Sequence, residues 1–184
     1  NHRIHQNIFR DIKNLNECLE ITELGQNALD IRFSAKPDVN AIQRLAETHE
    51  LDYALQPHEH RMKKLFLADM DSTIIQQECL DELAAFAGVG AEVAEVTEKA
   101  MEGKIDFESA LKERVSKLAT KPFSLCEDVL KYRISLSPAA ETTIRTLEKF
   151  GTRTILVSGG FDVFVTEVAR RCGFSGHYSN RLKV

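Results

Sequence analysis

The stretch LFLADMDSTII, residues 65–75, joins a short apolar run to two aspartates that are one residue apart. A run that is apolar at every position is typical of a strand buried on both faces of a parallel sheet. In an extended chain Asp69 and Asp71 point the same way, with Cα atoms about 6.5 Å apart. At an effective dielectric constant of about 20 their charges repel by roughly 2.5 kcal/mol. A divalent cation between them would reverse that sign, so the pair indicates a function.

The segments that follow residue 75 alternate between helical and strand patterns. TILV (154–157) predicts a second buried strand, and SGGF (158–161) turns it into a helix that ends at Gly173. A third strand is expected near Tyr178. Strands that alternate with helices predict an α/β fold with a parallel, Rossmann-like sheet and right-handed crossovers. Apolar residues at helical spacing predict the remaining helices. These lie at about 80–87, stopped by Gly88, at 91–101, 107–119 and 124–133, and after the N-cap pair Ser137-Pro138.

The first third of the chain shows a different pattern. Residues 29–35 and 51–55 alternate between apolar and polar side chains, as half-buried strands do, and residues 39–48 read as an amphipathic helix. Residues 56–64 are polar, contain a proline and read as a linker. We therefore expect two domains: a small α+β domain with its linker at residues 1–62, and an α/β domain at residues 63–184.

Composition and charge exclude several classes of protein. Hydrophobic residues make up 43% and charged residues 28% of the chain, as in globular domains. The net charge is −4 without a basic block, so we expect no nucleic-acid partner. No apolar run approaches the ~20 residues that span a bilayer, so we expect no membrane partner. The four cysteines lack metal-ligand spacing, which favours reduced thiols and a cytoplasmic location.

The two predicted strand ends carry complementary chemistry. In an open parallel sheet, ligands bind just beyond the carboxyl ends of the strands. Carboxylate oxygens without histidine or cysteine nearby favour Mg²⁺, which suits a phosphate substrate. A carboxylate can attack phosphorus to give an aspartyl-phosphate, and a second can act as acid and base. The SGGF turn offers amides and the Ser158 hydroxyl to an anion. Alternatively, the aspartates cap a turn and the glycines merely bend the chain.

DMDST (69–73) resembles the DxDx[TV] signature of the haloacid-dehalogenase superfamily. The segments ECLDELA, TEKAMEGKIDFESALKERV, VSGGFDVF and NRL match the run of the phosphoserine phosphatases, and the resemblance covers about two thirds of the chain. It implies Mg²⁺-dependent hydrolysis of O-phosphoserine to serine and phosphate, the last step of serine biosynthesis. It also implies a helical cap at about residues 76–135.

The resemblance implies a role for particular residues. Asp69 would be the nucleophile and a Mg²⁺ ligand, and Asp71 the general acid and base, which would bind the metal through its backbone carbonyl. The remaining implied residues would all contact the substrate. Ser158 and Gly159 would bind its phosphoryl group, Glu78 its ammonium and Arg114 its carboxylate. Met101 and Phe107 would cover it. The physical chemistry agrees, because arginine binds a carboxylate bidentately and an acid suits an ammonium.

Two further expectations follow from the resemblance. The family pattern continues, beyond the part that matches residues 180–184, with a lysine and an acidic cluster that complete the metal site. We therefore expect the sheet core in this chain to be incomplete, and the chain alone to be inactive or nearly so. Residues 29–55 resemble part of an ACT-like domain, which implies a possible homodimer. Two alternatives stay open: a phosphatase or phosphotransferase for another small phosphomonoester, and a non-catalytic amino-acid-binding module.

Overall fold

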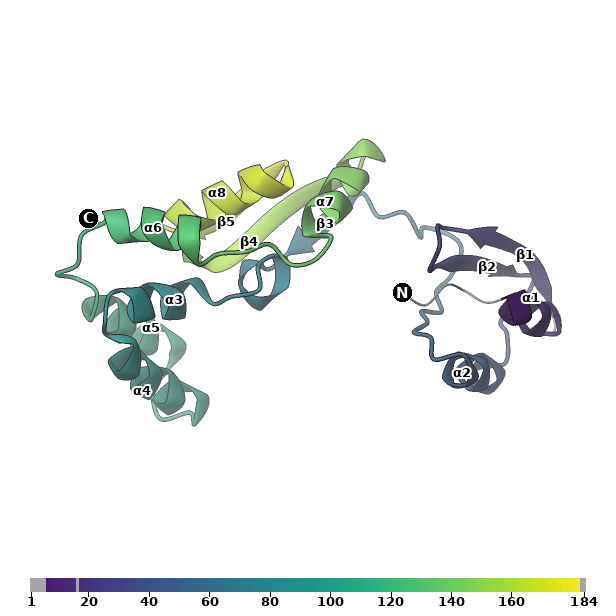
Figure 1. Cartoon of the computed structure of the whole chain (residues 1–184), viewed down its shortest axis with the longest axis horizontal. Helices are drawn as coiled ribbons and strands as arrows, with labels where there is room; N and C mark the ends of the chain where they lie inside the picture. Colours follow the sequence, from purple (N-terminus) through teal and green to yellow (C-terminus); the bar gives the residue numbers. More distant parts are fainter. Residues whose placement is uncertain (1–5, 16, 183–184) are drawn as a thin grey trace. The chain divides into compact units, whose positions relative to one another are not determined.

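The computed structural model describes residues 6–15 and 17–182, and it divides into two compact units, Asn1–Arg61 and Met62–Val184. The second unit is built around a parallel sheet of three strands in the order β3-β4-β5 (Figure 1). These strands span Leu65–Ala68, Arg153–Phe161 and Gly176–Asn180. The predicted α/β fold with a parallel sheet is confirmed, and β3 and β4 are direct neighbours.

Helices that follow β3 and β4 connect the strands of the sheet. Four helices and the wide turn η1 (Met70–Ile74) lie between β3 and the last helix before β4, and Figure 1 shows α3, α4 and α5 as a group beside the sheet. α7 packs on β4 and α8, and α8 packs on β4 and β5. The predicted helices are all present, with these bounds: α3 Cys79–Phe86, α4 Gly90–Met101, α5 Phe107–Ser116, α6 Ser124–Tyr132, α7 Ala140–Lys149 and α8 Asp162–Cys172.

Only one face of the sheet is packed against these helices. Ala68 and Leu156 are buried there, in one cluster with residues of α6, α7 and α8. On the opposite face Leu65, Leu67 and Val157 are 53%, 60% and 42% exposed. The prediction that both apolar runs are buried on both faces is therefore wrong. Successive side chains of a strand point to opposite faces, and among the described residues the helices join the cluster of one face alone.

The start of α7 also differs from the prediction. Ala139, with φ +63°, precedes the helix, and no side chain caps it, so Ser137 is not the N-cap. The Ser137 amide instead bonds to the Ile74 carbonyl at 2.9 Å, next to an antiparallel bridge between Ile75 and Leu136. Ser137 is thus held in the pairing of the two segments that lead to and from the helical group.

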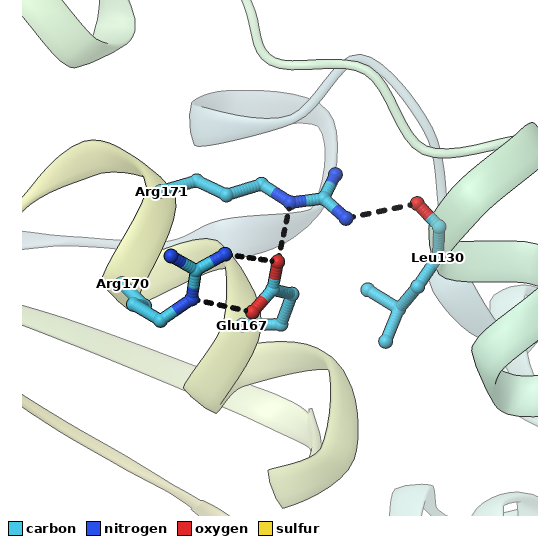
Figure 2. A network of polar contacts seen from close by, with 4 residues as sticks. All are labelled: Leu130, Glu167, Arg170 and Arg171. Carbon is cyan, nitrogen blue, oxygen red and sulfur yellow. Dashed lines mark hydrogen bonds and ion pairs between the residues drawn. The ribbon is translucent and has the colours of Figure 1, made fainter.

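A network of charged side chains connects α8 to α6 (Figure 2). Glu167 accepts hydrogen bonds from Arg170 at 2.8 Å and from Arg171 at 2.9 Å, and Arg171 also donates to the Leu130 carbonyl at 3.1 Å. These arginines lower the pKa of Glu167 to about 2. The carboxylate therefore keeps its charge, and its bond to Arg171, far below neutral pH.

The first unit contains a two-stranded antiparallel sheet and two helices, α1 (Gln6–Lys13), β1 (Cys18–Glu23), β2 (Leu29–Phe33) and α2 (Val39–Thr48). Ile8, Ile12 and Ile42 are its principal buried side chains. The sequence predicted β2 and α2 but not α1 or β1. The predicted strand at residues 51–55 is wrong, because this alternating segment pairs with no strand in the described part of the chain. Among the described residues, no helix has the length and apolarity to cross a membrane.

Candidate active site

The chain leaves β3 through a loop that carries both predicted carboxylates, residues 69–73, here called the acidic loop. Asp69 follows the strand in an extended conformation, and its Oδ1 accepts a hydrogen bond from the Met70 amide at 2.7 Å. The Ile75 amide bonds to the Met70 carbonyl at 3.0 Å and closes a wide turn. Asp69 is exposed and Asp71 is half-buried. The turn therefore presents both acids at the carboxyl end of the sheet.

The end of β4 forms the second side of the site through Ser158, Gly159 and Gly160, here called the glycine turn. The Ser158 hydroxyl donates to Asp71 Oδ2 at 3.2 Å and accepts from the Gly160 amide at 2.9 Å. A Cβ atom on Gly160 would lie 3.1 Å from Ser158 Oγ and 3.6 Å from Asp71 Oδ2. Glycine thus allows the close approach that the two loops make.

The start of α3 provides a further acid. Glu78 precedes the helix without capping it, and its Oε1 accepts a hydrogen bond from Ser72 Oγ at 2.7 Å. The next amide, that of Cys79, donates to Asp71 Oδ1 at 2.7 Å. Burial and the nearby Asp71 carboxylate raise the pKa of the Cys79 thiol. Cys79 is therefore a protonated, packed thiol rather than a nucleophile.

The predicted substrate-binding residues of α4 and α5 have different surroundings. Phe107 begins α5, and its Cζ atom lies 3.6 Å from the position of a Cβ on Gly159. Met101 ends α4 and is 85% exposed. Arg114 is half-buried, and its Nε donates to the Ala110 carbonyl at 3.4 Å. Among the described residues no hydrogen bond or ion pair connects Arg114 to the acidic loop. The structure thus brings Phe107 to the glycine turn and leaves Arg114 without such a contact.

Comparison with known proteins gives the family. A family model described as haloacid dehalogenase-like hydrolase matches residues 63–183. The chain belongs to the haloacid dehalogenase-like hydrolases. The matched range contains the acidic loop, the glycine turn and every helix of the second unit.

Similar members of this hydrolase family are phosphoserine phosphatases. The phosphoserine phosphatase of Archaeoglobus fulgidus is 37% identical over 89% of this chain and 46% of its own length. That of Methanocaldococcus jannaschii is 43% identical over 67% of this chain and 58% of its own length. The unliganded structure of a probable phosphoserine phosphatase from Vibrio cholerae has a TM-score of 0.75 at 32% identity, over 100% of this chain and 58% of that one. The chain therefore spans about half the length of the relatives it matches.

The donor chemistry of the site in this hydrolase fits the predicted Mg²⁺, which prefers oxygen ligands. Hydrogen bonds from Cys79 and Ser158 reach both carboxylate oxygens of Asp71. The predicted ligands, the Asp69 carboxylate and the Asp71 carbonyl, are oxygen donors of this kind. In the part of the chain that the structure describes, no group of three or more His, Cys, Asp or Glu side chains could hold a metal ion.

Two polar contacts at the site were not predicted from the sequence. Ser72 bonds to Glu78, and the side-chain amide of Asn180, at the end of β5, donates to the Gly159 carbonyl at 2.8 Å. Asn180 could have been found, because it follows the third parallel strand at the same edge of the sheet. Ser72 gives no such signal, since its contact depends on a left-handed backbone conformation, with φ +51°.

Proposed function

We propose that this hydrolase is a phosphoserine phosphatase, which hydrolyses O-phosphoserine to serine and phosphate through a phosphorylated Asp69. One observation carries the proposal: the Asp69–Asp71 pair and the glycine turn lie together, with Ser158 Oγ 3.2 Å from Asp71 Oδ2. The relatives support the choice of substrate. Two solved phosphoserine phosphatases that are 43% identical over 66% of this chain are a substrate-bound complex and a phospho-aspartyl intermediate analogue.

The reaction uses the two aspartates in turn. A carboxylate oxygen of Asp69 attacks phosphorus, and the bond between phosphorus and the serine oxygen breaks as Asp71 donates a proton to that oxygen. A water then attacks the phosphoryl group, passes its proton to Asp71 and frees Asp69. The Cys79 amide donates to Asp71 Oδ1 and the Ser158 hydroxyl donates to Asp71 Oδ2, so hydrogen bonds orient this carboxylate for the proton transfer. Asp69 and the Asp71 carbonyl would hold Mg²⁺, which when bound neutralises the phosphate charge.

The remaining predicted residues bind the substrate in this proposal. The Ser158 hydroxyl and the Gly159 amide hold the phosphoryl group, Glu78 pairs with the ammonium, and Arg114 binds the carboxylate. Phe107, already close to Gly159, covers the substrate together with Met101 once α4 and α5 move towards the sheet. Closing of such a helical cap excludes water from the reacting groups.

Substitution of the nucleophile tests the reaction. In the intact protein with Mg²⁺, Asp69→Asn should lower phosphate release from O-phosphoserine by about a thousandfold or more, because an amide is not a nucleophile towards phosphorus. Turnover by Asp69→Asn at the wild-type rate would refute the proposal. Thr48→Val, in the first unit, is a suitable control.

Substitution of the carboxylate-binding residue tests the substrate. Arg114→Ala should lower kcat/KM for O-phosphoserine by about a hundredfold, since about 3 kcal/mol is typical of a hydrogen-bonded charge pair. Its effect on phosphoethanolamine, which has no carboxylate, should be less than threefold. An equal loss on both substrates would favour the alternative, a phosphatase or phosphotransferase for another small phosphomonoester.

Several finer proposals accompany this function. The 184 residues alone should release little phosphate, because they span only about half the length of the relatives that they match. The first unit would be an ACT-like domain that pairs two subunits and binds amino acids, and the second the phosphatase core with a cap at about residues 76–135. A cytoplasmic location fits the four free cysteines. Sedimentation with and without serine tests the dimer.

A further inference from the structure

Hydrogen bonds join the acidic loop to the start of α3 at successive residues. The Ser72 amide donates to the Gln77 carbonyl at 3.2 Å, and the Ser72 hydroxyl donates to Glu78 Oε1 at 2.7 Å. The Cys79 amide donates to Asp71 Oδ1 at 2.7 Å. Ser72 therefore bonds to the Gln77 backbone and to the Glu78 carboxylate. The next residue of the same segment, Cys79, bonds to Asp71.

The conformation of Ser72 is unusual for its residue type. Its φ of +51° and ψ of +15° lie in the left-handed region, which costs a residue with a Cβ about 1 kcal/mol. Such conformations persist only where surrounding contacts maintain them. Here the hydroxyl reaches Glu78 from this conformation, and Glu78 has no capping bond of its own at the helix start.

The other side of Glu78 is fixed through Gln77. The Gln77 side chain donates to Ser135 Oγ at 2.8 Å and accepts from the Ser135 amide at 3.0 Å. The adjacent Gln76 amide bonds to the Ser135 carbonyl at 3.1 Å. The backbone before Glu78 is thus attached to the returning segment, and only the side-chain torsions of Glu78 remain to be set. Among the described residues, Ser72 is the one whose side chain hydrogen-bonds to that carboxylate.

We propose that Ser72 is a positioning residue for substrate specificity: its hydroxyl orients the Glu78 carboxylate to receive the ammonium group of the substrate. The inference rests on the proposed function, because it assumes that Glu78 faces the ammonium. An exposed glutamate side chain has several rotamers, and a charge-assisted hydrogen bond selects one before the substrate binds. The hydrogen bonds of Ser72 go to Gln77 and Glu78, so its expected effect is on binding rather than on the chemical step.

The test compares substrates with and without an ammonium in the intact protein. Ser72→Ala should raise KM for O-phosphoserine about five- to tenfold, as expected for the net loss of one hydrogen bond. Its kcat should change less than about twofold, and kcat/KM for phosphoglycolate, which has a carboxylate and no ammonium, should stay within about twofold. Equal losses on both substrates would overturn the proposal.

Two further variants separate the hydroxyl from the backbone. Ser72→Gly relieves the left-handed conformation but lacks the hydroxyl, so it should behave like Ser72→Ala. Ser72→Asn tolerates the same conformation and carries a donor, so it should recover part of the affinity for O-phosphoserine. Wild-type behaviour of Ser72→Gly would overturn the proposal, because the backbone alone would then suffice.

A double-mutant cycle distinguishes failure of this inference from failure of the proposed function. In a Glu78→Ala background, Ser72→Ala should cause no further loss with O-phosphoserine, because the carboxylate that it orients is gone. If Glu78→Ala impairs O-phosphoserine but Ser72→Ala does not, the positioning role is wrong and the function stands. If Glu78→Ala spares O-phosphoserine hydrolysis, the proposed ammonium site itself is wrong.

Discussion

The two faces of the parallel sheet carry similar residues in different surroundings. Leu156, on the face that packs against the helices, has no exposed surface, whereas Leu67, on the adjacent strand and the opposite face, is 60% exposed. Ile155 shares the face of Leu67 but is buried between its neighbours in the sheet. Apolar character alone therefore does not report burial in this sheet. Burial in this sheet comes either from a packed layer of helices, as at Leu156, or from close neighbours within the sheet, as at Ile155.

Polar groups sharpen the contrast between the two faces. Thr154 is fully buried on the helix-packed face, and its hydroxyl donates to the Glu148 carboxylate. The Ser175 hydroxyl donates to the Thr154 carbonyl at 2.8 Å. Among the described residues no buried side-chain polar atom lacks a partner. The packed face thus accepts a polar residue only where hydrogen bonds replace those to water.

The largest expected effect comes from removing the same atoms on each face. Leu156→Ala should lower the free energy of unfolding by about 3 kcal/mol, because the substitution leaves a cavity in a packed cluster. Leu67→Ala removes atoms that already contact water, and should cost less than about 1 kcal/mol. Urea unfolding followed by circular dichroism measures both. Equal losses would show that the two faces are equally covered in solution.

A smaller effect should follow from removing a buried hydroxyl. Thr154→Val keeps the shape of the side chain and removes its bonds to Glu148 and Ser175, so it should cost about 1 kcal/mol. The pKa of the Glu148 carboxyl, which is lowered first by the Thr154 hydroxyl, should rise in this variant. NMR titration measures the pKa, and an unchanged value would contradict the assigned hydrogen bond.

The sequence predicted the order of elements in the second unit because each helix has an apolar stripe of its own. It could not predict which face of the sheet is covered, since an all-apolar run such as LFLA has no period that distinguishes Leu65 from Phe66. In the first unit, residues 51–55 alternate like a strand but find no partner in the described chain. A strand depends on its neighbour as well as on its own pattern.

The site shows the same division between local and distant determinants. Asp69, Asp71 and the glycine turn could be predicted to meet, because the carboxyl ends of adjacent parallel strands share an edge. The bond between Ser72 and Glu78 could not, since it depends on one backbone torsion angle and on the return of the chain six residues later. The position of Arg114 relative to the two aspartates could not be predicted from the sequence either, because it depends on how α5 packs.

The charged network on the helical layer predicts a pH dependence. The pKa of Glu167 is about 2, lowered from the ordinary value of 4.5 by hydrogen bonds from Arg170 and Arg171. Its stabilising contribution is therefore present above pH 4.5 and is lost as the pH falls towards 2. After allowance for solvent screening, Glu167→Gln should cost about 1 kcal/mol at pH 7. Urea unfolding at pH 7 and pH 3 should show a smaller acid-induced loss in the variant than in the wild type.

The smallest expected effect is an isosteric change on the exposed face. Val157→Thr replaces a methyl group by a hydroxyl at a side chain that is 42% exposed, so water can bond to the hydroxyl and stability should change by less than about 0.5 kcal/mol. The same change at Val168, which is fully buried in α8, should cost about 1–3 kcal/mol because the hydroxyl loses water. A loss above about 1 kcal/mol at Val157 would mean that another layer covers this face in solution. A loss that grows with protein concentration would identify that layer as a second copy of the chain, and a constant loss would place it within the same molecule.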